Sequence, residues 1–171
     1  SQFVGVILKM FINVIFKVFK VPYSVHSQTV SVPDSFLEVM IAIVALAVLP
    51  ALAEELLFRG LVVRSYEKWG TKSAIVISAL LFGLLHLDIS SALATIFMGL
   101  LLAYVVVKTD SIISGILLHL VNNITAVFSI ILISKFPNVP QWVWLLIFII
   151  AVVIFVPLFM RFNKLNIKTK Y

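Results

Sequence analysis

Long apolar runs and short polar segments alternate along this chain, and the pattern predicts a series of apolar helices. Several runs approach or exceed the roughly 20 residues that a helix needs to cross about 30 Å of hydrocarbon. No strand-like alternation of apolar and polar positions suggests a membrane barrel. We therefore expect an all-α fold, a polytopic transmembrane bundle of about six to seven helices.

The first apolar stretch, residues 3–19, differs from the later ones. Lys9, Asn13 and Lys17 recur every four positions and draw a polar stripe along one face. This pattern predicts an interfacial helix, or the end of a span whose beginning is missing. The chain starts without Met, which suggests a fragment or a processed chain, and the interrupted stretch does not resemble a cleavable signal peptide.

Turn and cap residues bound the later helices. Ser35, followed three residues later by Glu38, has the pattern of a capping box. The expected helices cover approximately residues 35–66, 73–87, 91–107, 111–133 and 142–160. The second of these spans only about 22 Å, so we expect it to end inside the membrane near His86.

The chain is expected to form one unit of three consecutive segments. They are an N-terminal amphipathic or partial transmembrane helix with its loop (1–34), a helical core that holds the candidate site (35–134), and a final transmembrane helix with a basic tail (135–171). There is no internal repeat and no low-complexity segment.

Composition and charge support an integral membrane protein. Of 171 residues, 63% are hydrophobic and 12% charged, and mean hydropathy is +1.20. The 13 Lys and Arg exceed the 7 Asp and Glu, but they collect between apolar runs, which favours a topological role over a nucleic-acid partner. By the positive-inside rule, the basic segment around residues 59–72, the turn at Lys108 and the C-terminal tail face the cytoplasm, with Lys135 the main exception. Cysteine is absent, which excludes disulfides and thiolate chemistry.

A few polar groups interrupt the apolar runs. A charge at the centre of a membrane helix costs roughly 2.5 to 3.5 kcal/mol, so such groups usually face the bundle interior and mark a function. Helical rise places candidates from three helices at similar depths, about 12 to 20 Å from the cytoplasmic edge. The polar groups are Glu54, Glu55, Arg59, His86, His119, Asn122 and Asn123.

Spacing separates the two carboxylates. Glu55 and Arg59 stand at i and i+4 in the order that favours an ion pair, whereas Glu54 points about 100° away and lacks that partner. His119 and Asn123 also share one helix face, while Asn122 points elsewhere.

These residue types suit the hydrolysis of a carbonyl compound. Glu54 could act as general base for a water molecule, and His86 could hold that water or donate a proton to the leaving amine. His119 and Asn123 could donate hydrogen bonds to the oxyanion. Each residue alone also has a structural interpretation: a buried ion pair, an interior histidine or proton relay, or an amide that joins two helices.

Three motifs in order resemble a known family. The segment "EELLFR" from Glu54 fits EExxxR, "FGLLH" from Phe82 to His86 fits FxxxH, and "HLVNN" from His119 to Asn123 fits HxxxN. They resemble the CPBP family of intramembrane proteases, also called the CAAX protease and bacteriocin-processing or Abi family, which includes Rce1-type endopeptidases. The likeness covers roughly residues 35–127.

The resemblance implies a glutamic endopeptidase that needs no cofactor. Glu54 and His86 would activate water, His119 and Asn123 would form the oxyanion hole, and Glu55, Arg59 and Phe82 would support the site. A divalent metal bound by Glu54, His86 and His119 is the second interpretation, although no HExxH motif is present.

The expected partners are the lipid bilayer and a substrate, a small hydrophobic or lipidated peptide or protein that is reached from the cytoplasmic side. Bacterial relatives in this family are associated with peptide maturation, bacteriocin immunity and quorum-sensing export, and the composition favours a bacterial cell membrane. Two alternatives remain open. One is a non-enzymatic scaffold or immunity protein that binds a peptide or membrane partner in the same cavity. The other is a proton-coupled transporter, which the lack of inverted repeats disfavours.

Overall fold

The structure, a computed structural model, describes residues 32–86 and 89–165, and every regular element in these ranges is a helix. The expected all-α membrane bundle is confirmed. Within the described ranges, four helices are long and apolar enough to cross a membrane, namely Phe36–Trp69, Ser91–Thr109, Ile112–Lys135 and Trp142–Lys164. The helix expected over residues 3–19 lies outside the described residues.

The first span is one helical rod whose hydrogen-bonding pattern changes along its length. Its α-helical parts are α2 (Phe36–Ile43), α3 (Leu49–Glu55) and α4 (Arg64–Tyr66), separated by the π-helices η1 (Val44–Val48) and η2 (Leu56–Val63), and it ends in the 3₁₀ turn η3 (Glu67–Trp69). The predicted capping box starts the rod. Ser35 Oγ accepts from the Glu38 N–H at 3.2 Å, and the Glu38 carboxylate accepts from the Ser35 N–H at 3.3 Å.

Proline accounts for the first π-helix. Pro50 has no N–H to donate, and its ring would crowd the carbonyl four residues earlier, at Leu46. Widening the preceding turns into a π-helix relieves that contact without breaking the rod. Both π segments flank α3, the short helix that carries Glu54 and Glu55.

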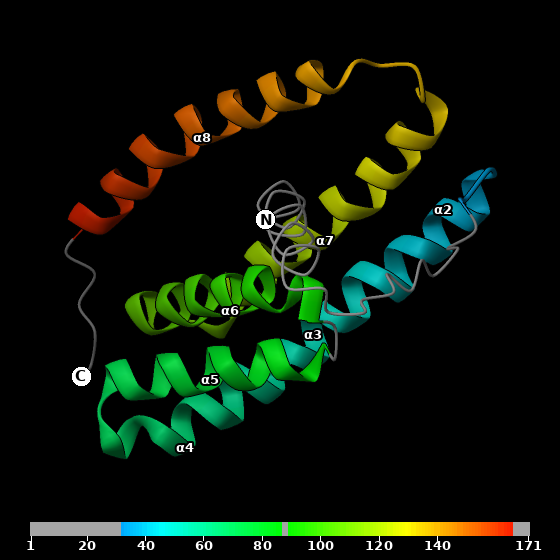
Figure 1. The fold of residues 1–171 in the computed structure, drawn as a ribbon. Helices are drawn as coiled ribbons and strands as arrows, with labels where there is room; N and C mark the ends of the chain where they lie inside the picture. Colours follow the sequence, from blue (N-terminus) through cyan, green and yellow to red (C-terminus); the bar gives the residue numbers. More distant parts are fainter. Residues whose placement is uncertain (1–31, 87–88, 166–171) are drawn as a thin grey trace, which may run out of the picture.

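The remaining helices are α5 (Thr71–Leu85), α6 (Ile89–Thr109), α7 (Ile112–Lys135) and α8 (Gln141–Lys164). As expected, α5 is short, and His86 caps its C-terminal end. Helices α5 and α6 lie side by side, while α7 packs against η1, α3 and α6 (Figure 1). The first span, α5, α6 and α7 thus surround a common interior.

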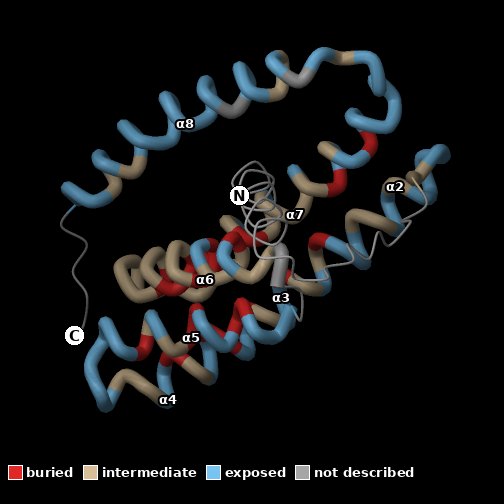
Figure 2. Tube along the Cα trace, viewed as in Figure 1, coloured by how far each residue is buried: buried red, intermediate tan, exposed pale blue. Residues whose placement is uncertain are grey.

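Buried residues gather in this interior, as Figure 2 shows by the red segments on the facing sides of the helices. Small residues let α5 and α6 approach closely, since a Cβ on Gly99 would lie 3.0 Å from the Ala79 Cα. Arg59 and Glu55 are among the largest side chains buried to less than 2% exposure. The centre of this apolar bundle is therefore ionic.

Helix α8 lies apart from the other helices along most of its length and is largely exposed (Figures 1 and 2). Its C-terminal end is tied to α6. Tyr104 donates from its hydroxyl to Asn163 Oδ1 at 2.7 Å, and Lys108 Nζ donates to the Asn163 carbonyl at 2.7 Å. An exposed apolar helix of this kind suits contact with lipid.

Basic residues meet at one end of the bundle. Arg64, near the end of the first span, lies 3.1 Å from the carboxylate of Asp110 in the turn between α6 and α7. Asp110 occupies the left-handed region at φ 49°, which Asp tolerates better than most residues. Lys108 and its contact with α8 lie beside the same turn.

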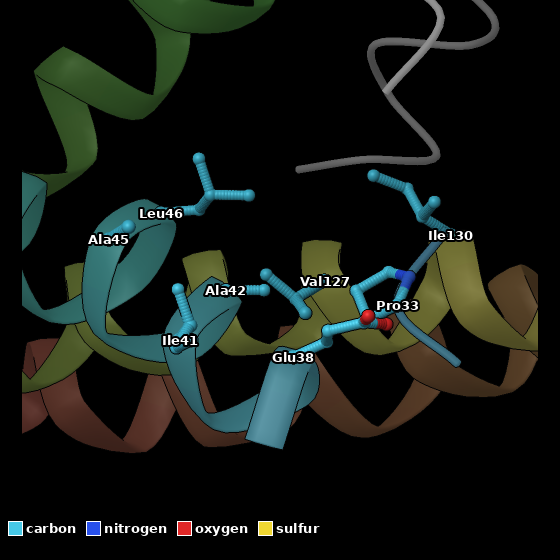
Figure 3. Close-up of a pocket in the computed structure, with 8 residues that line it drawn as sticks. All are labelled: Pro33, Glu38, Ile41, Ala42, Ala45, Leu46, Val127 and Ile130. Carbon is cyan, nitrogen blue, oxygen red and sulfur yellow. The ribbon is translucent and has the colours of Figure 1, made fainter. Parts of the chain in front are cut away.

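A pocket of about 340 Å³ opens between the first span and α7 (Figure 3). Its lining is mostly apolar and comprises Pro33, Glu38, Ile41, Ala42, Ala45, Leu46, Val127 and Ile130. None of these residues belongs to the predicted site. The pocket and the candidate catalytic groups are therefore separate features.

A buried serine joins α5 to the second π-helix. Ser78 Oγ donates to the Phe58 carbonyl at 3.2 Å, and Ser78 is fully buried. We expect Ser78→Ala to lower the free energy of unfolding by about 0.5–1.5 kcal/mol because the carbonyl loses its donor. Exposed Ser73→Ala on the same helix is the matched control. Unfolding in detergent, followed by circular dichroism, measures both; equal losses would contradict the assigned hydrogen bond.

Candidate active site

The site is built around the buried carboxylate of Glu55. Arg59 Nη1 donates to Glu55 Oε1 at 2.7 Å, and both side chains have no exposure to solvent. Arg59 Nη2 donates to the Gly99 carbonyl on α6 at 2.9 Å. The i,i+4 pair expected from the spacing is therefore present, and it also anchors the first span to α6.

His119 on α7 approaches the same carboxylate from another helix. His119 is 3% exposed, and its Nδ1 lies 3.0 Å from Glu55 Oε1. Because Glu55 is held by Arg59 as a carboxylate and can only accept, Nδ1 carries the proton of this hydrogen bond. Glu55 thereby fixes the orientation and tautomer of His119.

The other ring nitrogen of His119 faces Glu54. His119 Nε2 lies 3.7 Å from Glu54 Oε2, within ion-pair range but too far for a direct hydrogen bond. The Glu54 side chain is 24% exposed, and its Oε2 has no hydrogen-bond partner among the described residues. The Glu54 side chain is thus partly exposed although this oxygen is buried, whereas Glu55 is enclosed.

Phe82 on α5 connects the parts of the site by ring contacts. The guanidinium of Arg59 lies 4.7 Å from its ring centroid, a cation–π geometry. The rings of His119 and His86 lie 5.7 Å and 4.9 Å from it, and Phe58 packs against it edge to face at 5.2 Å. This buried phenyl ring fixes both histidines relative to the ion pair.

His86 lies at the edge of this arrangement. Its Nδ1 is 2.8 Å from the Phe82 carbonyl, and since a carbonyl only accepts, Nδ1 carries the proton and Nε2 is left to accept. The residue is exposed. Within residues 32–86 and 89–165, its hydrogen bond goes to Phe82 and not to Glu54 or His119.

Asn123 lies one turn beyond His119 on α7 and is partly buried. Its Oδ1 accepts from Asn122 Nδ2 at 3.1 Å. The two amides therefore interact, although the spacing had predicted that they diverge. With its oxygen occupied, Asn123 keeps its own NH₂ group as a donor.

Two glycines lie beside the ion pair and were not among the site residues predicted from the sequence. Gly99 supplies the carbonyl that holds Arg59, and a Cβ on Gly115 would lie 2.7 Å from Glu55 Oε2. One signal was available, because Gly115 stands four residues before His119 and shares its helix face.

The metal interpretation needs Glu54, His86 and His119 in one cluster. Among the described residues, no group of three or more His, Cys, Asp or Glu side chains could hold a metal ion. Glu54 and His119 are brought together, and His86 stands apart from them in its contacts.

A carboxylate and a histidine held together between apolar helices can perform acid–base chemistry. Comparison with protein families matches residues 36–125 to the family described as type II CAAX prenyl endopeptidase Rce1-like. The chain belongs to this family and is, in general terms, a CAAX-type intramembrane protease. Searches of curated proteins and of solved structures gave no match.

Breaking the buried pair should be costly. We expect Arg59→Leu to lower the free energy of unfolding by about 3–5 kcal/mol, because the Glu55 carboxylate stays buried without its guanidinium. Arg64→Leu is the control at a partly exposed pair and should cost about 0.2–1 kcal/mol. Thermal unfolding of both variants in detergent measures the difference, and similar losses would contradict the central role of the pair.

Proposed function

We propose that this protein hydrolyses a peptide bond with a water molecule activated by Glu54 and His86, and that His119 and Asn123 stabilise the oxyanion. The observation that carries the proposal is the chain of contacts from Arg59 through Glu55 to His119, which holds His119 Nε2 at 3.7 Å from Glu54 Oε2. A reacting oxygen beside this pair of atoms could contact both.

The geometry supports Glu54, rather than Glu55, as the general base. Glu55 Oε1 is occupied by Arg59 and His119, and the side chain is fully enclosed. Glu54 is partly exposed, and no cationic side chain of the described residues is in direct hydrogen-bond contact with it. Glu54 takes a proton from water, the hydroxide adds to the carbonyl carbon, and the C–N bond breaks as a proton passes to the amine.

His86 supports water activation through its tautomer. With Nδ1–H donating to Phe82, the neutral ring presents Nε2 as an acceptor for a water hydrogen. Small movements of its exposed ring could bring Nε2 to a water that Glu54 also contacts, since catalytic hydrogen bonds tighten when substrate binds.

His119 and Asn123 each have a nitrogen whose hydrogen-bonding capacity could serve the oxyanion. His119 Nε2 can donate to the oxyanion when it carries a proton, and it lies 3.7 Å from Glu54 Oε2. Asn123 donates from Nδ2. Each donor of this kind can contribute about 3 kcal/mol to stabilising the transition state.

The apolar surroundings support a small hydrophobic or lipidated peptide or protein as the substrate, which we propose is reached from the cytoplasmic side. The family description, a prenyl endopeptidase, points the same way. We propose that the end with Arg64 and Lys108 faces the cytoplasm, by the positive-inside rule. The setting we propose is a bacterial cell membrane, with a role in peptide maturation such as bacteriocin or quorum-sensing processing.

Loss of either water-activating residue should stop cleavage. We expect Glu54→Gln and His86→Ala each to lower the cleavage rate by about 10²–10⁴-fold, the usual contribution of acid–base catalysis. Glu67→Gln, at the basic end of the bundle, should retain full activity. Purified protein is incubated with hydrophobic and prenylated peptides, cuts are mapped by mass spectrometry, and circular dichroism confirms folding.

Full activity in either variant would refute these roles. If purified protein cuts no peptide, and its cellular function survives both substitutions, the chain acts as a scaffold or immunity protein.

Removal of divalent metal should leave cleavage unchanged. The proposed water activation uses carboxylate and imidazole alone, so a chelator added to the same assay is expected to have no effect on the rate. If the chelator abolished cleavage and added zinc or another divalent ion restored it, the metal mechanism would be favoured. An apo sample prepared by dialysis gives the independent comparison.

A further inference from the structure

Gly115 on α7 lies where the Glu55 carboxylate meets the backbone of that helix. It is buried, and an ideal Cβ built on it would lie 2.7 Å from Glu55 Oε2 and 2.5 Å from Val106 Cγ2. A real Cβ essentially never comes this close to another heavy atom, so a side chain here would displace at least one of the two. The carboxylate therefore occupies space that only glycine leaves open.

The position of this glycine couples it to His119. The two residues stand at i and i+4 on one face of α7, so the helix presents both to the same carboxylate. Glu55 Oε2 faces Gly115, while Oε1 accepts from His119 Nδ1 at 3.0 Å. Moving Oε2 away from residue 115 would swing Oε1 and lengthen the bond to His119.

Glu55 has little freedom to absorb such a displacement. Its side chain has no exposure, and Arg59 Nη1 holds Oε1 at 2.7 Å. Arg59 is itself fixed by the Gly99 carbonyl at 2.9 Å. A methyl group at position 115 would therefore disturb the hydrogen bond between Glu55 and His119.

We propose that Gly115 is a positioning residue that acts through Glu55 to hold His119 in its working orientation, with Nδ1–H directed at Glu55 Oε1. Its importance for catalysis rests on the proposed function, in which His119 stabilises the oxyanion. The effect on the His119 hydrogen bond does not depend on that function.

Other glycines show what is particular about this one. A Cβ on Gly99 would meet backbone and side-chain carbon of Ala79 at 3.0–3.2 Å, which is a packing constraint between helices. A Cβ on Gly60 would lie 3.4 Å from Ile112 Cδ1, an ordinary contact. Gly115 alone among these three faces an ionised group of the site, and Gly60 offers a matched control.

The first test reads the His119 hydrogen bond directly. The chain has three histidines, so nuclear magnetic resonance of histidine-labelled protein in detergent, with His119→Gln for assignment, resolves the His119 ring signals. Gly115→Ala should remove the signature of an Nδ1–H hydrogen bond to a carboxylate, and Gly60→Ala should retain it. An unchanged His119 signal in Gly115→Ala would overturn the proposal, whether or not the protein cleaves peptides.

The second test separates an effect through Glu55 from simple packing. The double variant Val106→Ala with Gly115→Ala relieves the contact with Val106 and leaves the contact with Glu55. It should fold, and it should still lack the His119 signature. Recovery of the wild-type signal in this variant would show that helix packing alone had been disturbed.

Kinetics provide the third test for protein that cleaves peptides. Because small misplacement of a catalytic group can cost about 100-fold, we expect Gly115→Ala to lower kcat by roughly that factor with KM unchanged. Adding Gly115→Ala to Glu55→Gln should produce little further loss, since both act on the same contact. Additive losses in kcat, or a rise in KM alone, would contradict positioning through Glu55.

Discussion

The burial of the Glu55 carboxylate is the constraint on which the rest of this site depends. A carboxylate with no exposure in an apolar bundle has to be neutralised and hydrogen-bonded. Otherwise the free-energy cost of its desolvation would exceed the stabilisation that the rest of the fold provides. Arg59 supplies the charge from the same helix, and His119 supplies a hydrogen bond from α7. One buried acid thereby holds the first span and α7 together, and through Arg59 and Gly99 it also holds α6.

Because Arg59 pairs with Glu55, the neighbouring Glu54 does not pair with Arg59. Glu54 follows the same backbone but points to a partly open position, and its Oε2 faces the ring nitrogen of His119 that Glu55 does not use. The two adjacent carboxylates therefore have different roles. The enclosed Glu55 orients the His119 ring, and the partly exposed Glu54 faces that ring from the other side. This division follows from geometry alone, since the two residues are chemically identical.

The helices provide this geometry through departures from regularity. Pro50 and the two π segments change the hydrogen-bonding pattern of the first span on both sides of α3. The short α5 ends at Leu85, and Phe82 near its end contacts the Arg59 guanidinium and the rings of His86 and His119. Close approach of α5 and α6 through Ala79 and Gly99 brings the Gly99 carbonyl within reach of Arg59.

The sequence by itself determined the features that depend on neighbouring residues. Apolar run length predicted the spanning helices and the short α5, the pattern from Ser35 to Glu38 predicted the cap, and the i,i+4 spacing predicted the bond between Glu55 and Arg59. These predictions succeed because helical rise and periodicity convert sequence separation directly into distance. The order of the three motifs likewise indicated the family to which the chain belongs.

Only the tertiary structure decided which groups meet across helices. The bond from His119 to Glu55 joins residues 64 positions apart, and the place of Gly115 beneath that carboxylate depends on how α7 rotates against α3. Depth along the membrane put His86 level with Glu54, yet the hydrogen bond of His86 goes to Phe82. Depth is a single coordinate, whereas contact also requires the rotation and spacing of each helix, and side-chain packing between distant segments sets both.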